Sequence, residues 1–370
     1  MEIFIATKYP ETCALEVKEL IKKPSKIYEN VCFVKDVSKQ EITKLCYHLQ
    51  SSERICVSLI DFEIQELKKQ LEKIDSIEKS YLKNINSFEV RSERAENIDI
   101  TSNELNKIIG DKINNITKLK VNLTNPDMTF YVVATNHFFV GIDVVGFDMS
   151  KRPYKITNQT DSLNGAFAYH LLRVCNIKKT SSIVDAFAGT GTIPIEAALF
   201  QSQISTFKFE NKFNGFKLDF IKNEFLTQEE IEKKFKFEKQ LDIYAYDGLI
   251  KHLLGIQKNS KLAGIDKNIN SSKLTIDWLE TKLDENSIDF IITDPPKFNK
   301  KLDNLKEIEK LMDELFYQAK FVLKNKGILA ILTNRTEEII LQAKKHKFKN
   351  KNILELKRGE QIYYFMIFEK

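Results

Sequence analysis

Residues 181–199 read SSIVDAFAGTGTIPIEAAL, and this stretch decides the fold. A short apolar run ends at Asp185, a turn follows at Gly189 and Gly191, and a segment of helix-forming residues begins after the turn. Glycine adopts backbone dihedrals that side chains forbid and lets a ligand approach the backbone closely. The threonine and proline after the turn suit the start of a helix. The stretch therefore predicts a strand, a ligand loop and a helix, with a nucleotide-type site at the strand's carboxyl end.

A second stretch has the same design. Residues 287–298 read SIDFIITDPPKF, an apolar strand that ends at Asp294 and is followed by two prolines. Prolines lack an N–H donor and fix the course of the chain, so the Asp294 carboxylate and the Pro295 carbonyl are left as acceptors that point outward. Two such strand ends in one region favour a ligand site over two ordinary strand–helix turns.

Composition describes a water-soluble globular chain. Its 370 residues, 42% hydrophobic and 29% charged, suffice for two or three domains. The net charge of +5 is a mild indication of an anionic partner. The five cysteines include no Cys-x-x-Cys pair and the chain shows no secretory leader, which indicates a reduced, cytoplasmic protein. No apolar run approaches the roughly 20 residues that cross a bilayer, and the five histidines lack metal-ligand spacing, so we expect neither a membrane span nor a metal.

Strands and helices alternate after residue 180. The expected strands are 181–185, 242–246, 274–278, 288–293, 327–333 and 361–368, and the expected helices are 193–201, 251–262, 308–323 and 337–346. Such alternation builds an open, mostly parallel sheet covered on both faces. Here a terminal hairpin is expected to add the last strands to that sheet. Residues 203–240, rich in Phe, Lys and Glu, interrupt the pattern as an insertion without an evident role.

The first 180 residues follow a small α+β pattern. The expected strands are 3–7, 26–34, 54–61, 88–91, 118–123, 129–135 and 138–145, and the expected helices are 11–22, 39–49, 64–74, 101–110 and 162–174. Residues 91–94 are expected to form a charged loop. The predicted parts are an N-terminal segment 1–50, a domain 51–149, a linker and helix 150–179, and a domain 180–370.

The N-terminal part resembles a THUMP domain, an RNA-binding module attached to RNA-modifying enzymes. The matching stretches are FEVRSER at 88–94, IGDKI at 109–113, VNLTNPD at 121–127 and VGID at 140–143. The resemblance implies that the first fifty residues are the ferredoxin-like segment that accompanies this module, and that RNA is the partner. Arg91 and Arg94 would then contact backbone phosphates, which supply affinity without reading sequence. The alternative is that both arginines lie on a solvated loop.

The C-terminal part resembles the class I S-adenosylmethionine methyltransferases, whose Rossmann-like sheet has an antiparallel last strand. A dinucleotide fingerprint would place glycine or alanine where this chain has a proline, three residues after the second glycine. The resemblance implies an α/β fold with a Rossmann-like methyltransferase sheet at the C-terminus, preceded by the ferredoxin-like/THUMP region.

The same resemblance assigns cofactor-binding residues. The methionine part and sugar of S-adenosyl-L-methionine would be held by Asp185, Phe187, Gly189 and Gly191. Two further acids at predicted strand ends would accept hydrogen bonds from the ribose hydroxyls (Asp247) and from the adenine amino group (Asp277). The alternative for these aspartates is helix capping, since Asp after a strand often begins the next helix.

Asp294, Pro295 and Pro296 resemble the Asp/Asn-Pro-Pro-Tyr/Phe motif of methyltransferases that modify exocyclic amino nitrogens. An aryl amine is a poor nucleophile until fixed acceptors hold its hydrogens, and the Asp294 carboxylate and Pro295 carbonyl can aim its lone pair for direct transfer. The target base must leave its stack to reach them. Lys297 stands where this motif usually has an aromatic residue, and Phe298 follows it. Either Phe298 stacks on the base, or Lys297 covers it as an RNA contact, or the substrate differs.

Other activities share parts of these motifs. Some cytosine-C5 methyltransferases of ribosomal RNA carry a similar Asp-Pro-Pro-Lys-Phe, but they require a cysteine nucleophile, and no cysteine follows Cys175. Adenine-N6 and cytosine-N4 methylation fit the motif alone, whereas the THUMP resemblance and DAFAGTGTIPIEAA at 185–198 point to guanosine N2 in tRNA.

Three alternatives stay open: the same chemistry on large-subunit ribosomal RNA, a non-catalytic RNA-binding protein, and, with least support, a dehydrogenase. The sequence does not indicate the modified position, the number of methyl groups or the oligomeric state.

Overall fold

The computed structural model describes residues 1–63, 76–158, 162–210, 212–234, 237, 239–296, 305–358 and 361–370. The chain forms two compact units. The first comprises Met1–Lys151 and Ser205–Phe235, and the second comprises Arg152–Ile204 and Lys236–Lys370. In the described part of the chain, no helix is both long and apolar enough to span a membrane.

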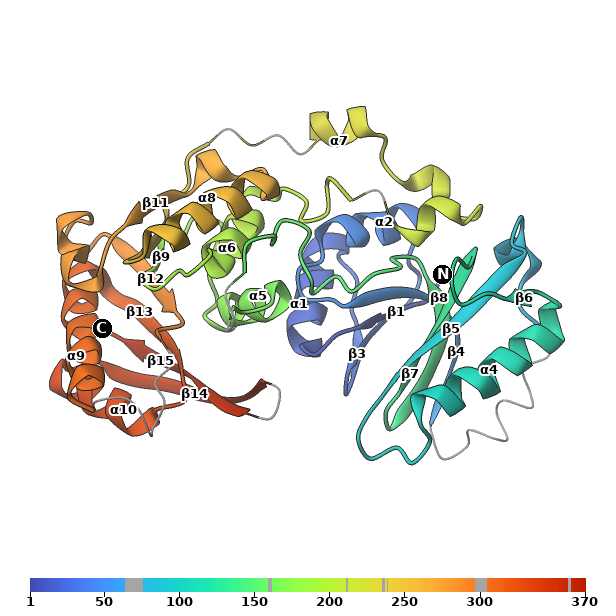
Figure 1. The fold of residues 1–370 in the computed structure, drawn as a ribbon, viewed down its shortest axis with the longest axis horizontal. Coiled ribbons are helices and arrows are strands. Elements are labelled where there is room, and N and C mark those ends of the chain that lie inside the picture. Colours follow the sequence, from blue (N-terminus) through green and yellow to red (C-terminus); the bar gives the residue numbers. More distant parts are fainter. Residues whose placement is uncertain are drawn as a thin grey trace. The chain divides into compact units, whose positions relative to one another are not determined.

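The first unit is built on one eight-stranded sheet with the order β2-β3-β1-β4-β8-β7-β5-β6 (Figure 1). Its strands are β1 (Ile3–Ala6), β2 (Lys26–Tyr28), β3 (Val31–Val34), β4 (Arg54–Glu63), β5 (Ser87–Arg94), β6 (Lys120–Val121), β7 (Met128–Ala134) and β8 (His137–Asp143), and its main helices are α1 (Pro10–Ile21), α2 (Lys39–His48) and α4 (Ser102–Thr117). The antiparallel pair β1–β4 joins strands from both predicted N-terminal segments. The segments 1–50 and 51–149 therefore share one sheet.

Three local predictions in this unit differ from the structure. The single strand expected at 26–34 is a hairpin of the antiparallel strands β2 and β3. The capping box at Thr101 forms as expected, with its side chain accepting from the Glu104 backbone N–H, but α4 continues past residue 110 to Thr117. The predicted charged loop at 91–94 is wrong, because β5 pairs with β7 from Phe88 opposite Met128 to Arg94 opposite Ala134. The predicted helix at 64–74 lies outside the described residues.

The insertion belongs to the first unit rather than to the methyltransferase-like domain in which its sequence lies. Its apolar side chains join the core of the N-terminal sheet, namely Phe207, Phe213, Leu218, Phe220, Ile221, Phe225 and Ile231. The Ser205 hydroxyl also donates to the Tyr47 carbonyl at 2.6 Å. This burial explains the phenylalanine-rich composition, and it divides the domain predicted at 180–370.

The second unit contains a seven-stranded sheet with the order β11-β10-β9-β12-β13-β15-β14. Its strands are β9 (Ile183–Asp185), β10 (Ile243–Asp247), β11 (Asn270–Lys273), β12 (Ile288–Thr293), β13 (Leu323–Thr333), β14 (Lys349–Arg358) and β15 (Gln361–Glu369), and its helices are α5 (Gly165–Val174), α6 (Thr192–Ser202), α8 (Ile250–Ala263), α9 (Leu305–Val322) and α10 (Thr336–Lys345). The neighbouring strands β11, β10, β9, β12 and β13 are parallel, and β15 pairs antiparallel with β13. This confirms the predicted Rossmann-like sheet with its antiparallel hairpin.

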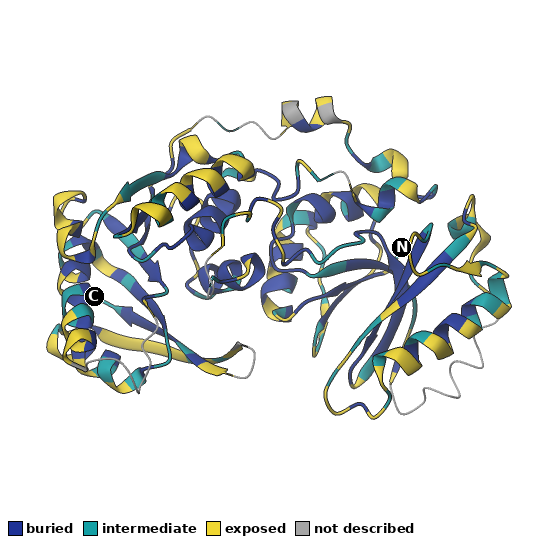
Figure 2. Ribbon diagram, in the orientation of Figure 1, coloured by how far each residue is buried: buried dark blue, intermediate teal, exposed yellow. Residues whose placement is uncertain are grey.

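Helices cover both faces of the second sheet. In Figure 1, α9 and α10 lie on one face, and α6 and α8 lie on the other. Figure 2 shows the central strands of both units buried and the outward faces of the helices exposed. The linker helix α5 packs on α6 and so belongs to the second unit.

One predicted strand of this unit is wrong. The edge strand is β11, a polar Asn-Ser-Ser-Lys run without an apolar pattern, whereas the residues predicted as strand 274–278 lead into the 3-10 helix η6 (Ile276–Thr281). The buried side chains of η6 are Ile276 and Leu279. Their spacing of three matches the period of a 3-10 helix rather than that of a strand.

Candidate active site

The candidate site lies at the carboxyl ends of three neighbouring parallel strands, β10, β9 and β12. These strands end at Asp247, Asp185 and Thr293, and Asp294 follows the last of them directly. Ligands of open α/β sheets bind at this edge. The fold therefore gathers the acids that the sequence predicted as site residues.

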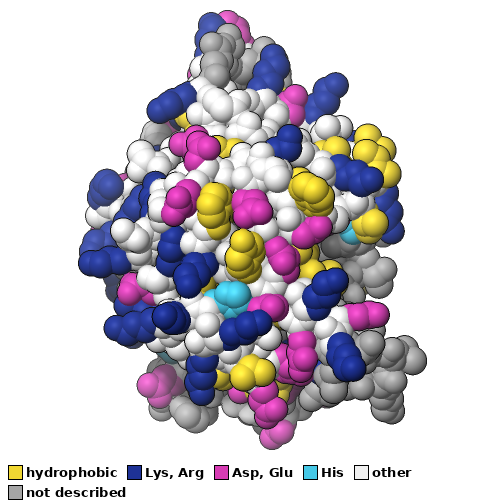
Figure 3. Space-filling view, turned by 90° about the vertical axis from the view of Figure 1, so that its left-hand side faces the viewer, with side chains coloured by type: hydrophobic (Ala, Val, Ile, Leu, Met, Phe, Trp, Pro, Cys, Tyr) yellow, Lys and Arg dark blue, Asp and Glu magenta, His cyan; other side chains and the backbone are white. Residues whose placement is uncertain are grey.

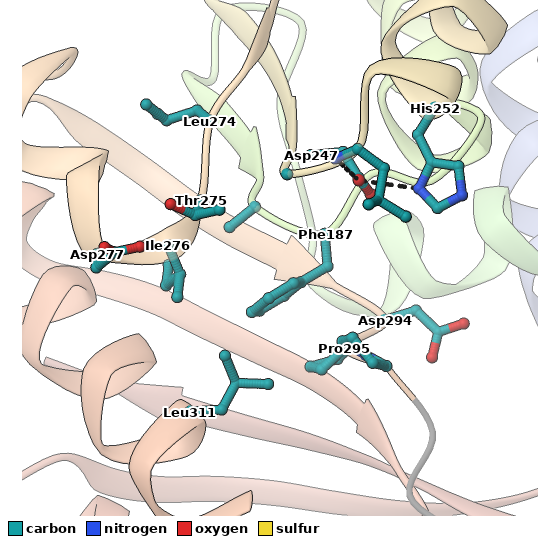
Figure 4. A pocket seen from close by; sticks show the side chains of 14 residues that line it. Phe187, Asp247, His252, Leu274, Thr275, Ile276, Asp277, Asp294, Pro295 and Leu311 are labelled. Carbon is teal, nitrogen blue, oxygen red and sulfur yellow. Dashed lines mark hydrogen bonds and ion pairs between the residues drawn. The ribbon is translucent and has the colours of Figure 1, made fainter. Parts of the chain in front are cut away.

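A cavity of about 700 Å³ opens at this edge, a size typical of small-molecule sites. Its described lining residues are Ala186, Phe187, Asp247, Gly248, Leu249, His252, Leu274, Thr275, Ile276, Asp277, Asp294, Pro295, Pro296 and Leu311. Figure 4 shows Thr275 and Asp277 at one end, His252 and Asp294 at the other, and Phe187 between them. Three of the predicted cofactor-binding residues, Asp185, Gly189 and Gly191, are not among these lining residues.

Asp185 is buried next to the cavity and holds the loop in place. Its Oδ1 atom accepts hydrogen bonds from the Thr293 hydroxyl at 2.6 Å and from the Phe187 backbone N–H at 3.2 Å. The pKa of Asp185 is raised to about 7, chiefly by burial and to a smaller extent by the nearby carboxyls of Asp294 and Asp247, while these hydrogen bonds act to lower it. Asp185 thus connects the ends of β9 and β12.

The glycine loop has the backbone that the sequence predicted. Gly189 and Gly191 have φ values of 53° and 89°, in the left-handed region that favours glycine. The Gly191 N–H donates to the Ala188 carbonyl at 2.8 Å and closes the turn. Helix α6 begins immediately afterwards, with Gly191 as its N-cap.

Asp247 joins this loop to the next strand. Its Oδ2 atom accepts the Gly189 backbone N–H at 3.0 Å, and its Oδ1 atom accepts the Leu249 N–H at 2.9 Å and lies 2.9 Å from His252 Nδ1. His252 lines the cavity, although no histidine was predicted as a site residue. The missed signal is its position five residues after a strand-end acid, in the first turn of the following helix.

The far end of the cavity is more open. Asp277, predicted for the adenine amino group, lies exposed in the first turn of η6. Leu274, Ile276 and Leu311 form apolar walls beside it. The sequence missed these three because their proximity depends on the packing of η6 and the turn before it against α9.

The Asp-Pro-Pro segment follows β12 and lines the cavity at the His252 end. Asp294 is half-buried, Pro295 is buried and Pro296 is exposed. The neighbouring Lys297 and Phe298 lie outside the described residues. Within the described ranges, no three His, Cys, Asp or Glu side chains gather as they would around a metal ion.

The predicted RNA contacts lie on β5 of the first unit. Arg91 Nε lies 2.8 Å from Glu89 Oε1, and Arg94 Nη1 donates to the carbonyl of Ile98 at 2.9 Å. Both arginines remain exposed, so their predicted contact with phosphate stays a prediction. The face of the protein seen in Figure 3 carries basic and acidic side chains intermixed, which agrees with the small net charge.

Both units of the chain have matches among known proteins. The model of an RMKL-like methyltransferase domain matches residues 152–361, and the model of a THUMP domain matches residues 63–143. The chain is 27% identical to the tRNA (guanine(6)-N2)-methyltransferase of Archaeoglobus fulgidus over 93% of this chain and 85% of that protein. It is 32% identical to the Methanocaldococcus jannaschii protein of the same name, over 79% of each chain.

Solved structures share the fold along the whole chain. TrmN from Thermus thermophilus superimposes with a TM-score of 0.71 at 18% identity, and all of both chains is covered. A predicted N6-adenine-specific DNA methylase from Listeria monocytogenes gives a TM-score of 0.79 at 17% identity, with 99% of this chain and 95% of that one covered. The matches confirm both resemblances, and the chain belongs to the RMKL-like methyltransferase family and carries a THUMP domain ahead of its methyltransferase domain.

Proposed function

We propose that this protein is an S-adenosylmethionine-dependent methyltransferase that methylates the exocyclic N2 of a guanosine in tRNA. The observation that carries the proposal is one cavity with a nucleoside-sized volume and strand-end acids, bounded at one end by Asp294 and Pro295. The names of the two archaeal relatives state the same reaction, and each similarity extends over at least 79% of both chains.

The residues of the cavity fit the cofactor. A carboxylate has about four acceptor positions, and the three described contacts of Asp247 leave capacity for a ribose hydroxyl. Phe187 and Ile276 offer apolar walls to an adenine ring, and Asp277 can accept from its amino group. The bound cofactor supplies an electrophilic methyl group on a sulfonium sulfur.

Asp294 and Pro295 would act on the nucleophile. The carboxylate and the Pro295 carbonyl accept the two N–H groups of the guanine amine and hold its lone pair in line with the methyl group. As the new N–C bond forms and the methyl–sulfur bond breaks with its electron pair left on sulfur, the nitrogen would become positively charged, and Asp294 would accept the proton that it loses. We further propose that Phe298 or Lys297 covers the base after it leaves its stack.

RNA would be held by the THUMP unit. We propose that Arg91 and Arg94 contact backbone phosphates with the exposed parts of their side chains. Such contacts position the RNA and leave the choice of nucleotide to the active site.

The test is transfer of tritium from labelled S-adenosylmethionine to unmodified tRNA and to ribosomal RNA from a strain that lacks the protein, followed by nucleoside analysis. We expect label in N2-methylguanosine of tRNA. Label only in ribosomal RNA would favour that substrate, and no label in either would favour a non-catalytic RNA-binding protein.

Asp294→Ala tests the mechanism. We expect transfer to fall by at least 1000-fold while binding of S-adenosylhomocysteine, measured by calorimetry, stays within threefold of wild type. The matched control is Asp284→Ala, which removes an exposed acid that does not line the cavity. Retained turnover in Asp294→Ala would remove this carboxylate from the mechanism.

A further inference from the structure

Asn259 of α8 ties the glycine loop to another segment of the methyltransferase unit. Its Nδ2 atom donates to the Thr190 carbonyl and to the Thr157 carbonyl, each at 3.0 Å. Its Oδ1 atom accepts the Thr157 backbone N–H at 3.1 Å. The residue is 1% exposed, its bond to Thr190 is buried, and its two bonds to Thr157 are partly buried.

The position of these bonds gives them a role in the loop. Thr190 stands between Gly189 and Gly191, and both glycines adopt left-handed backbone conformations. Glycine has many accessible conformations, so contacts from outside must fix the direction of the Thr190 carbonyl. Asn259 supplies such a contact, although it is not among the described residues that line the cavity.

Gly255 lets α8 approach the same two threonines. A Cβ atom on Gly255 would lie 3.0 Å from Thr190 Cγ2 and 3.2 Å from Thr157 Cγ2. Gly255 and Asn259 are four residues apart and therefore lie on one face of the helix. This face lies against the loop at Gly255 and donates one hydrogen bond to it from Asn259.

The segment at Thr157 is itself fixed to the helix that follows the loop. Arg152 donates to Glu196 from Nε at 2.8 Å and from Nη2 at 3.0 Å, and the Tyr154 hydroxyl donates to Glu196 at 2.7 Å. Glu196 belongs to α6, which begins where the loop ends. The end of the loop is therefore fixed by α6, which begins there. The middle of the loop is fixed by Asn259, which also forms hydrogen bonds with Thr157 in the segment that is anchored to α6.

We propose that Asn259 is a positioning residue for S-adenosylmethionine binding, which acts by fixing the Thr190 carbonyl between the two glycines of the loop. The inference rests on the proposed function, because it needs the cofactor to bind beside this loop. Loss of the Asn259 amide would let the loop sample other conformations, and cofactor affinity would fall while the methyl-transfer step at saturating cofactor would change little.

The test compares Asn259→Ala with Asn268→Ala by calorimetric titration of the full chain with S-adenosylhomocysteine. Asn268 is a close match, since it is 2% exposed and donates to the carbonyls of Lys239 at 2.7 Å and Phe237 at 3.4 Å, but it does not contact the loop. We expect Kd to rise at least tenfold for Asn259→Ala and to stay within twofold for Asn268→Ala. With saturating cofactor, kcat of Asn259→Ala should stay within threefold of wild type.

A second variant tests the inference if Asn259→Ala does not fold. Gly255→Ala keeps the Asn259 hydrogen bonds but pushes the Thr190 and Thr157 side chains by a few tenths of an ångström, and alanine favours the helix. We expect a three- to tenfold rise in Kd without a fall in the unfolding temperature. The control is Gly110→Ala in α4, where the added Cβ would meet Val90 at an ordinary 3.8 Å.

The outcomes separate the two proposals. If wild type does not bind S-adenosylhomocysteine, the proposed function fails. If wild type binds it and both Asn259→Ala and Gly255→Ala bind within twofold of wild type, the positioning role of Asn259 is refuted. An equal loss of affinity in Asn259→Ala and Asn268→Ala would also overturn it, because general destabilisation would then explain the effect.

Discussion

Gly189 donates its backbone N–H to the Oδ2 atom of Asp247 at 3.0 Å, across 58 positions of sequence. The bond joins the glycine loop after β9 to the end of β10, so it fixes the position of the loop relative to the Asp247 carboxylate at the cavity. The other oxygen of the same carboxylate accepts the Leu249 N–H. Asp247 therefore shapes the site as well as lining it.

Asp247→Asn should weaken cofactor binding. The amide keeps the size of the side chain, but its NH₂ group must face either the Gly189 N–H or the Leu249 N–H, and one contact becomes repulsive. Loss of a charge-assisted hydrogen bond costs roughly 1.5–3 kcal/mol, so we expect Kd for S-adenosylhomocysteine to rise between ten- and a hundredfold in calorimetry. The control is Asp266→Asn, at an exposed aspartate that does not line the cavity. Unchanged affinity in Asp247→Asn would contradict this role.

The pKa of Asp185 predicts a pH-dependent stability. Burial raises this pKa from 3.8 to about 7, so the folded protein binds the proton more tightly than the unfolded chain does. The stabilisation from this group is complete below about pH 4 and is lost as pH rises through about 7. The difference between the pKa values of Asp185 in the folded and unfolded states corresponds to about 4 kcal/mol of unfolding free energy.

Asp185→Asn tests that sign, because asparagine is neutral at every pH and its carbonyl can still accept from Thr293. Relative to wild type, the variant should gain stability as pH rises from 4 to 8. Thermal unfolding at pH 4, 5, 6, 7 and 8 measures this difference. A difference that does not vary with pH would mean that Asp185 is charged throughout.

The sequence predicted the strand ends at Asp185, Asp247 and Asp294, because each acid follows an apolar run whose end is visible locally. It was wrong for Asp277, which lies in the 3-10 helix η6 and not at a strand end. It could not predict that Asp185 would be covered while Asp247 and Asp294 line the cavity. That difference depends on how far each strand extends beside its neighbours. His252 was missed for a related reason, since only the turn after β10 brings its Nδ1 atom to Asp247.

The division of the chain was harder to predict. Residues 205–235 follow α6 in sequence, and local patterning cannot tell which core their phenylalanines will enter. Phe213 lies against Tyr47, from the first fifty residues, with ring centroids 5.5 Å apart. Such a partner follows from the three-dimensional path of the chain and not from periodicity.

Glu196 forms a buried ion pair whose disruption should destabilise the methyltransferase unit. Its side chain and that of Arg152 are both 0% exposed. Glu196→Gln would leave the guanidinium without its counter-charge, and breaking a buried pair in this way costs roughly 3–5 kcal/mol. Urea unfolding of the full chain should show the loss.

Two comparisons separate charge from packing at this pair. The double variant Arg152→Met with Glu196→Gln removes both charges, and it should be more stable than Glu196→Gln alone. The exposed pair Lys233–Glu229, with side chains 75% and 78% exposed, is the surface control, and Glu229→Gln should leave the unfolding midpoint almost unchanged. If the double variant is less stable than the single one, packing rather than the unpaired charge dominates.

Phe213→Ala should destabilise the first unit, although residue 213 lies between elements of the second in sequence. The ring is 1% exposed and packs against Tyr47, Phe147 and Phe225, with centroid distances of 5.5, 5.3 and 5.4 Å. Truncation of a buried phenylalanine costs roughly 3–5 kcal/mol. Hydrogen exchange followed by mass spectrometry should therefore show lost protection in peptides from β1 and β7, with β9 and β12 unchanged. Phe209→Ala, at a ring that is 59% exposed, is the control and should change neither set. Lost protection in β9 and β12 instead would mean that the insertion stabilises the methyltransferase sheet.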